Sequence, residues 1–185
     1  MNFHFRRAEE DVETERVDHL IEHRAPWLLF GLIGGLFTTL IVSQYEEILS
    51  SDVRLAFFIP IIVYLSDAVG TQTETIYVRE LSEKKIHFAT YIAKESIIGL
   101  VLGVISGGAL GLFASVWLGS ALIGITLGLT MLINLTLAPV LAICIPSILY
   151  KEHADPALGS GPVATILQDL ISLLVYFFIA SIFIL

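Results

Sequence analysis

The sequence predicts an all-α membrane protein with five transmembrane helices in each protomer. Hydrophobic residues make up 56% of the 185 residues, more than in an average soluble domain. Several uninterrupted apolar runs reach about twenty residues, the length that an α-helix needs to cross the hydrocarbon core. Lysine and arginine fall almost entirely on one side of a five-span arrangement. These three observations predict a multi-pass protein of the cell (inner) membrane, in contact with the lipid bilayer.

The five expected helices follow from the apolar runs. We expect them at residues 27–48, 53–81, 91–116, 120–150 and 163–185. The fourth contains Pro139 and Pro146, so we expect it to tilt or kink. Because the connecting segments are short, residues 25–185 are predicted to form one transmembrane domain. Residues 84–95 are expected to lead into the third helix at the membrane interface.

The distribution of basic residues predicts the orientation. Of the ten Lys and Arg residues, only Arg54 would lie on the side opposite the N-terminus. By the positive-inside rule, the N-terminus is cytoplasmic and the C-terminus is outside. Residues 1–24 are charged, and we expect no cleavable signal peptide there. We read them as an acidic cytoplasmic tail, in which residues 8–24 form a helix that either covers a pore mouth, lies on the headgroups or is solvated.

Several classes of function are not indicated. The lone Cys144 lies in an apolar run, which argues against a disulfide framework or a thiolate metal cluster. No basic, aromatic-interleaved patch indicates nucleic-acid binding. No phosphate-binding glycine loop, nucleophile–base arrangement or zinc signature is present, so we do not expect an enzyme.

Rows of small residues mark the third and fourth helices. Gly99, Gly103, Gly107 and Gly111 recur every four residues, and Ser120, Gly124 and Gly128 do the same. This spacing is typical of closely packed membrane helices, so we expect packing here. Polar residues at 126, 130 and 134 form a stripe on the fourth helix, which we expect to join helices by hydrogen bonds.

Two acidic residues lie inside the second helix. Asp67, Thr71 and Glu74 share one face. A carboxylate in the hydrocarbon core costs about 2.5–3.5 kcal/mol on insertion scales, so it should face the bundle interior or a water-filled path. We favour an ion pathway over a buried ion pair, since Arg79 is expected to reach the cytoplasmic interface.

The fifth helix carries a matching line of side chains. A Gly/Pro-rich turn over residues 155–162 is expected to bring backbone carbonyls close to it. Asp169 is expected about two turns inside the membrane, level with Glu74 on the second helix. The expected polar face comprises Pro162, Thr165, Asp169, Ser172 and Tyr176.

The chemistry of these groups selects a class of ion. Carboxylate, carbonyl and hydroxyl oxygens suit Mg²⁺, Ca²⁺ or Mn²⁺. Mg²⁺ usually keeps several waters and contacts one or two carboxylates, which fits a polar vestibule with few acids. We therefore expect Mg²⁺ as the bound and transported ion, with Mn²⁺, Ca²⁺ and Co²⁺ as alternatives.

The same elements carry a resemblance to a known family. The stretch from Trp27 to Leu185 resembles the membrane domain of the MgtE family of magnesium transporters. The matching elements are Tyr45-Glu46, Leu55-Ala-Phe-Phe-Ile-Pro60, Gly70-Thr-Gln72, Arg79-Glu-Leu81, Lys94-Glu95 with Gly99 and Gly103, Pro146, and Asp155-Pro-Ala-Leu-Gly-Ser-Gly-Pro162 leading to Thr165 and Asp169.

The resemblance implies a homodimer of five-helix protomers, with the ion path at the two-fold axis along the second and fifth helices. It implies that Asp169 is the pore aspartate, with Thr165 one turn and Gly161 two turns earlier. Asp67 and Glu74 are additions to the family pattern, whereas the family's asparagine is replaced by Ala68. We expect no soluble sensor domains, such as the CBS repeats of longer relatives.

Three functions remain open at this stage. The favoured one is a divalent cation channel or transporter, with Mg²⁺ as the expected ion, that moves ions down the electrochemical gradient through a pore at the dimer interface. The alternative is an exchanger coupled to protons or Na⁺ through Asp67 or Glu74. The third is a membrane scaffold that transports nothing, in which the acids only pair internally.

Overall fold

The structure is a computed structural model that describes residues 16–83, 87–151 and 156–184. The described chain is helical, and five of its helices are long and apolar enough to cross a membrane, which confirms the predicted five-helix, all-α class. The elements in order are α1 (Val17–Ser43), α2 (Glu46–Ser51), the 3₁₀ helix η1 (Val53–Phe58), α3 (Ile59–Glu83), α4 (Phe88–Leu118), α5 (Ala121–Lys151) and α6 (Pro156–Phe183).

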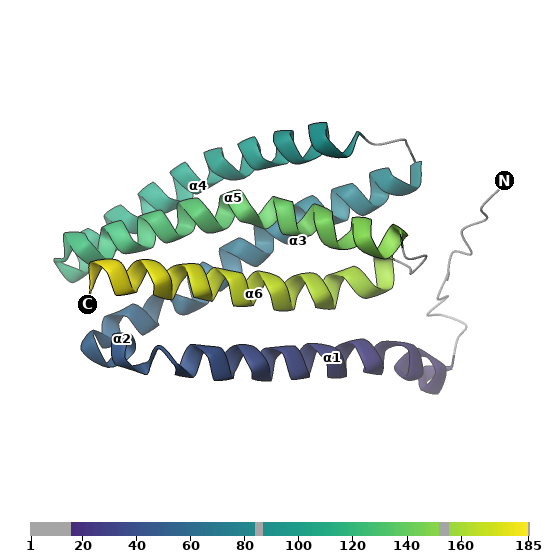
Figure 1. Cartoon of the computed structure of the whole chain (residues 1–185), viewed down its shortest axis with the longest axis horizontal. Helices are drawn as coiled ribbons and strands as arrows, with labels where there is room; N and C mark the ends of the chain where they lie inside the picture. The colour runs from purple at the N-terminus through teal and green to yellow at the C-terminus, as the bar shows by residue number, and fades with distance from the viewer. Residues whose placement is uncertain (1–15, 84–86, 152–155, 185) are drawn as a thin grey trace.

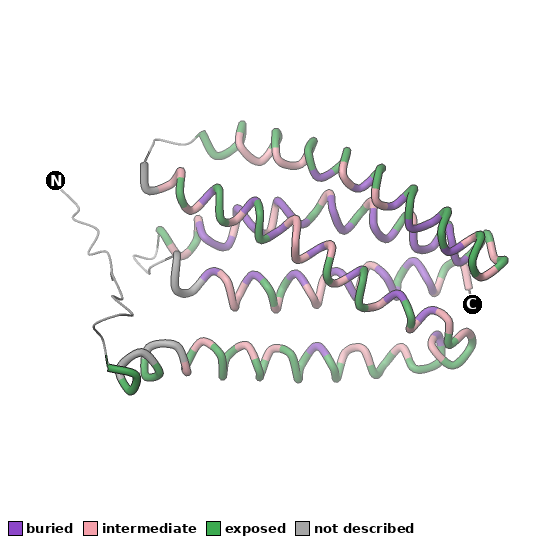
Figure 2. The backbone as a smooth tube through the Cα atoms, turned by 180° about the vertical axis from the view of Figure 1, so that it is seen from behind, coloured by how far each residue is buried: buried purple, intermediate pink, exposed green. Residues whose placement is uncertain are grey.

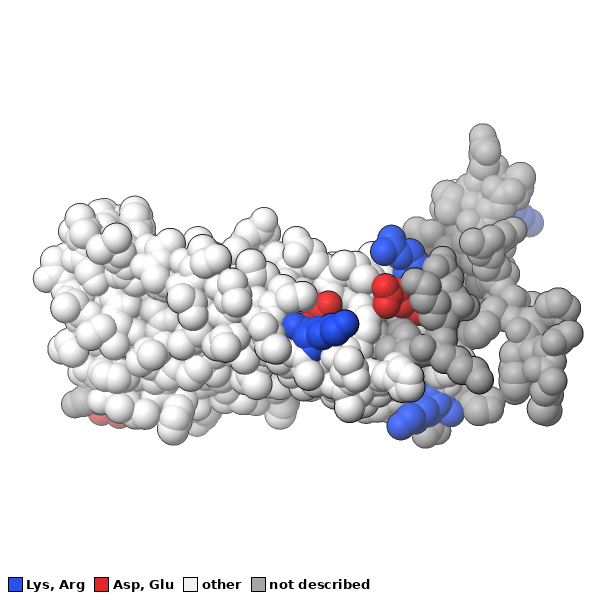
Figure 3. Space-filling model, turned by 90° about the horizontal axis from the view of Figure 1, so that it is seen from above, with Lys and Arg blue, Asp and Glu red and all other residues white. Residues whose placement is uncertain are grey.

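The long helices run side by side along the length of the molecule. In Figure 1, α1 and α4 lie at opposite edges, and α3 crosses the bundle diagonally behind α5 and α6. Figure 3 shows that charged side chains gather toward one end of the visible face and that most of its remainder is uncharged. Such a long uncharged surface is expected of helices that lie in lipid.

Helices α4 and α5 form the closest pair, and their glycines explain why. A Cβ at Gly107 would lie 2.5 Å from the carbonyl oxygen of Gly128, and one at Gly111 would lie 2.7 Å from that of Gly124. The predicted packing role of these rows is therefore confirmed. Proline at 139 cannot donate to the carbonyl of Leu135, and Gly99 packs directly against that free carbonyl.

Helix α1 is attached much more loosely. Only 6% of its membrane span is buried, and its main contact is with α6. Gly34 makes this contact possible, because a Cβ there would lie within 2.8 Å of three Ile166 carbons. Figure 2 shows α1 as largely exposed along its length.

Some helix ends differ from those expected. The first helix ends at Ser43 instead of residue 48, because the chain turns at Gln44 and Tyr45 before α2. The ring of Tyr45 stacks on Phe177 of α6 at 4.7 Å between centroids, which holds the turn in place. The expected helix 53–81 starts as η1 and becomes α-helical at Ile59.

The remaining boundaries are close to prediction, with one exception. Helices α4 and α5 begin and end within three residues of the expected ranges. Helix α6, in contrast, begins at Pro156, so most of the predicted turn over residues 155–162 is helical. A proline is well tolerated at a first helical position, which accounts for this early start. Residues 1–15, most of the proposed tail, lie outside the described residues, whereas residues 17–24 belong to α1.

Candidate cation site

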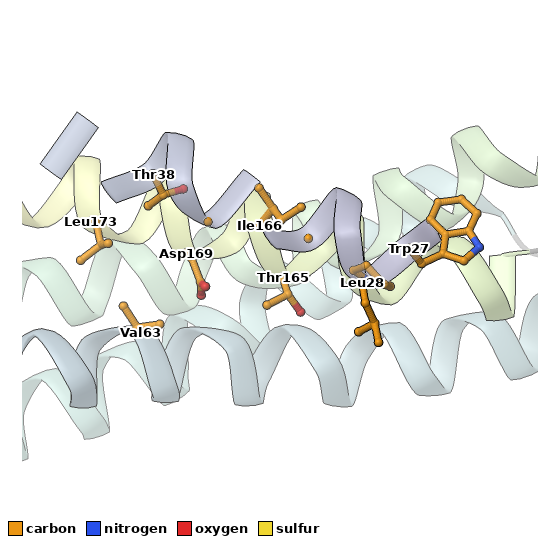
Figure 4. Close-up of a pocket in the computed structure, with 11 residues that line it drawn as sticks. Trp27, Leu28, Thr38, Val63, Thr165, Ile166, Asp169 and Leu173 are labelled. Atoms are coloured by element: carbon orange, nitrogen blue, oxygen red, sulfur yellow. The ribbon is translucent and has the colours of Figure 1, made fainter. Parts of the chain in front are cut away.

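A cavity of about 520 Å³ lies within the membrane-spanning part, between α1, α3 and α6. Figure 4 shows Thr165 and Asp169 reaching from α6 toward α3, on the side where Val63 lies. Most of the wall is apolar or glycine, so these two side chains supply much of its polar character. The residues that line the cavity are Trp27, Leu28, Gly31, Gly35, Thr38, Val63, Pro162, Thr165, Ile166, Asp169 and Leu173.

Asp169 occupies the middle of α6, farther from the helix end than expected. The prediction of two turns counted from residue 163, but the helix begins at Pro156. Its Oδ1 atom is buried and accepts no hydrogen bond from the described residues. A buried carboxylate oxygen without a donor is costly in a membrane, so this atom needs a positively charged or hydrogen-bonding ligand.

Asp67 of α3 is the acidic neighbour of Asp169. Its Oδ1 accepts a hydrogen bond from the hydroxyl of Thr165 at 3.4 Å. Its charge interacts with those of both Asp169 and Glu74. Two carboxylates and one hydroxyl, contributed by α3 and α6, therefore converge beside the cavity.

Glu74 lies at another depth along α3 and α6. The sequence placed it level with Asp169, but its carboxylate accepts a hydrogen bond from Ser160 instead. Ser160 precedes Asp169 by nine residues, which is about 13 Å along an α-helix. The difference arises because Asp67, about two helical turns before Glu74 on α3, is the acid that meets the middle of α6. Asp67 and Glu74 thus mark two depths in the bundle.

Gly161 is part of α6 and not of a turn. The space where a Cβ would stand at Gly161 is open, and its neighbour Pro162 lines the cavity. Proline has no N–H, so the carbonyl of Leu158 lacks its intrahelical donor. Helix therefore replaces the predicted turn at Gly161, and Pro162 removes one bond from that helix.

The predicted polar face of the fifth helix divides in two. Pro162, Thr165 and Asp169 face the cavity, whereas Ser172 and Tyr176 are buried in the core. The Tyr176 hydroxyl donates to the carbonyl of Leu55 at 2.8 Å. The five residues do share one side of the helix, but its neighbours change along its length: η1 and α5 cover the part at Ser172 and Tyr176, whereas the part at Thr165 and Asp169 borders the cavity.

The stripe on α5 also behaves differently from expectation. The hydroxyls of Thr126 and Thr130 donate to carbonyls four residues earlier in their own helix. Only Asn134 joins two helices, through a bond from Nδ2 to the carbonyl of Ser172 at 3.2 Å. Threonine commonly satisfies its hydroxyl within its own helix, which the residue pattern alone does not reveal.

Sequence reasoning missed two parts of the site. The first is the α1 wall of the cavity. The spacing of Gly31 and Gly35 marks a glycine face on this helix, but it does not say that the face borders the cavity. The second is Gln168, whose Nε2 donates to the carbonyl of Ser66 at 3.2 Å. The signal in the sequence that could have identified Gln168 was its position directly before Asp169.

The donor set suits a hard, hydrated dication. Carboxylate and hydroxyl oxygens are the ligands that Mg²⁺ and related ions accept, and Mg²⁺ keeps several of its waters. The described residues bring no three His, Cys, Asp or Glu side chains together. The arrangement is a pair of acids beside a cavity, and it differs from a closed all-protein metal cage.

Comparisons with known proteins agree with this chemistry. A family model described as MgtE, divalent cation transporter, matches residues 59–179, which include α3 through most of α6. Proteins named magnesium transporter MgtE from Bacillus subtilis and Enterococcus faecalis are 34% and 37% identical over 164 and 163 residues. These matches cover 87% and 86% of the chain but 36% of each relative. The relative of the same name from Thermus thermophilus is 27% identical over 160 residues, which is 35% of its length.

Proposed function

Because the chain belongs to the MgtE family of divalent cation transporters, we propose that it moves divalent cations, Mg²⁺ before others, across the cell (inner) membrane. The chain spans about a third of the length of the curated relatives that it matches, and those relatives are named magnesium transporters. The proposal concerns ion movement along α3 and α6 and involves no enzymatic step.

The observation that carries the proposal is the state of Asp169. A carboxylate in the middle of a membrane-spanning helix has a buried oxygen without a hydrogen-bond donor in the described chain. It stands beside a cavity of about 520 Å³ and interacts with a second carboxylate. A passing dication would relieve both the repulsion and the unsatisfied oxygen.

We assign roles to the site residues accordingly. Asp169 and Asp67 bind the cation directly or through its waters, and Thr165 orients Asp67 by its hydrogen bond. Glu74 attracts the ion at a second depth, beside Ser160. The open space at Gly161 leaves room for a hydrated ion next to the α6 backbone.

A homodimer would complete this path. Following the MgtE resemblance, we propose a two-fold axis beside α3 and α6, where a second copy would add another Asp67 and Asp169. Thr165, at the same site, is exposed in the single chain, as are many large apolar side chains of α1. We orient the protomer with its N-terminus in the cytoplasm, since Arg79, Lys94 and Lys151 would then follow the positive-inside rule.

The membrane potential is sufficient to drive uptake. At 100 mV, inside negative, a dication gains about 4.6 kcal/mol, twice the value for one charge. This corresponds to a concentration ratio of roughly three orders of magnitude. Channel-like flow down the gradient therefore needs no coupled ion. A proton- or Na⁺-coupled exchanger, using Asp67 or Glu74, is the second candidate, because these two acids add titratable groups to the path.

The test is a flux assay in proteoliposomes with an imposed voltage. We expect Mg²⁺ uptake by the wild type, at least about tenfold less uptake by Asp169→Asn, and an intermediate loss for Asp67→Asn. The control is Asp18→Asn, because Asp18 lies at the start of α1 in an exposed pair with Arg16. Competition with Mn²⁺, Ca²⁺ and Co²⁺ ranks the ions.

Three outcomes would contradict parts of the proposal. Normal flux in folded Asp169→Asn would remove Asp169 from the path. Flux that stops without a proton or Na⁺ gradient at fixed voltage would establish the exchanger instead. No flux of any divalent cation by the folded wild type would favour the scaffold.

A further inference from the structure

We propose that Gln168 is a positioning residue that holds Asp67 opposite Thr165 and Asp169. Gly70, which has no side chain, leaves the space that the Gln168 side chain needs. The inference rests on the proposed function, because the alignment of α3 with α6 matters for selectivity only if ions pass between them. Gln168 itself would not touch the ion. It would act through Asp67 and Asp169, each of which directly follows one of the two residues that its hydrogen bond joins.

The hydrogen bond joins the two helices at the height of the acids. The Nε2 of Gln168, on α6, donates to the carbonyl oxygen of Ser66, on α3, at 3.2 Å. Both residues are buried, with 4% and 0% of their surfaces exposed. Gln168 directly precedes Asp169, and Ser66 directly precedes Asp67. A bond between these two residues therefore fixes how the two acids are placed relative to each other.

Gly70 makes the carbonyl of Ser66 accessible. In an α-helix this carbonyl accepts from the N–H of residue 70, so a side chain at that position stands beside it. A Cβ at Gly70 would lie 2.9 Å from Oε1 and 3.3 Å from Cδ of Gln168. Because these atoms belong to the end of a side chain, that amide would have to move while the backbone stayed in place.

A second amide restrains α6 from another direction. Asn134 of α5 donates to the carbonyl of Ser172, one turn after Gln168. Bonds to α3 and α5 together resist both sliding and rotation of α6. A rotation by one residue is about 100°, which would turn Asp169 away from Asp67.

The first experiment measures Mg²⁺ and Ca²⁺ flux in proteoliposomes. We expect Gln168→Leu to raise the half-saturating Mg²⁺ concentration and to lower the Mg²⁺ to Ca²⁺ flux ratio, each by about tenfold. Gly70→Ala should have a similar effect. In a Gln168→Ala background, Gly70→Ala should add almost nothing, since the side chain that it displaces is already gone.

The control is Tyr176→Phe on the same helix. It removes another buried bond from α6 to a backbone carbonyl, that of Leu55. This bond lies two turns from Asp169, so its loss should lower thermal stability without changing the half-saturating concentration or the flux ratio. A merely structural role for Gln168 predicts the same result as this control.

The second experiment does not depend on transport. In a Cys144→Ala background, Asp67→Cys with Thr165→Cys places two thiols where the side chains now meet. Oxidation should cross-link them, and Gln168→Leu should slow the reaction by at least about fivefold. Tyr176→Phe should leave the rate unchanged.

The two experiments separate the two proposals. If the wild type transports no divalent cation but Gln168→Leu still slows cross-linking, the positioning role would be supported and the proposed function overturned. Unchanged cross-linking and an unchanged flux ratio would overturn the positioning role while leaving transport intact. Additive effects of the Gly70 and Gln168 substitutions would overturn the role assigned to Gly70.

Discussion

Two aspartates of this chain show how surroundings separate a structural carboxylate from a candidate binding group. Asp52, in the loop between α2 and η1, accepts from Arg54 Nη2 at 2.6 Å and from Arg54 Nε at 2.8 Å. It also accepts from the Arg54 backbone N–H at 3.0 Å, which caps η1. Asp169 has a buried oxygen with no donor in the described chain. The first carboxylate is satisfied by the protein, whereas one oxygen of the second has no partner in the described chain, which is why we propose it as a ligand-binding group.

The fully bonded state of Asp52 gives a prediction about pH. The hydrogen bond from the Arg54 guanidinium holds the pKa of Asp52 below its ordinary value of 3.8. A lowered pKa in the folded state stabilises the fold above pH 3.8, and this contribution is lost as pH falls through the lowered value. Asp52→Asn should therefore lower the melting temperature at pH 7, by about 2 °C, and much less near pH 3.

Thermal unfolding in detergent at the two pH values measures this effect. Asp18→Asn serves as the control, because its pair with Arg16 is exposed, at 61% and 85%, and should contribute almost nothing at either pH. A loss of the same size at pH 3 and pH 7 would mean that the Arg54 bond is not its cause.

At the scale of helices, the glycines of α4 show how much a sequence pattern can settle. A four-residue spacing of small residues predicts a packing face, because the geometry of a single helix is enough to bring such residues onto one side. Gly107 lies on that face, and its neighbour Gly108 is exposed with no atom within 4 Å of a Cβ position. Adjacent glycines therefore have different structural roles.

This difference predicts opposite outcomes for one substitution at two positions. Gly107→Ala would press a methyl group against the carbonyl of Gly128, and we expect a loss of about 1–3 kcal/mol of unfolding free energy. Gly108→Ala should be neutral or slightly stabilising, since alanine has the higher helix propensity. Unfolding in mixed micelles measures both, and equal effects would contradict the assigned packing face.

Contacts between helices were harder to predict than the helices themselves. The five spans are local properties of apolar runs, so the sequence was sufficient for them. The pairing of Asp67 with Thr165 depends on how α3 crosses α6, where Gln168 bonds the carbonyl of Ser66 and its amide lies against Gly70. The start of α6 was missed for a different reason, because Gly and Pro near a helix end favour turns and helix starts alike.

At the scale of the molecule, the position of α1 determines what fills the cavity. This helix contacts α6 but is buried over only 6% of its span. The α1 wall of the cavity is therefore only loosely packed against the rest of the bundle. Gly31 and Gly35 face open space there, opposite Thr165 and Asp169. An aqueous ion path requires this cavity to hold water, whereas an apolar wall alone would also accept lipid chains.

Cysteine accessibility separates a water-filled cavity from a lipid-filled one. In a Cys144→Ala background, Gly35→Cys would place a thiol in the cavity, and Leu36→Cys would place one on the exposed apolar surface of α1. Charged methanethiosulfonates react with thiolates in water, so we expect Gly35→Cys to react at least about tenfold faster than Leu36→Cys. Mg²⁺ should slow the first reaction by occupying the path beside Asp169 and should leave the second unchanged. Equal, slow reaction at both positions would show that lipid fills the cavity, and the ion path would then have to run along the other side of Asp169, between two copies of the chain.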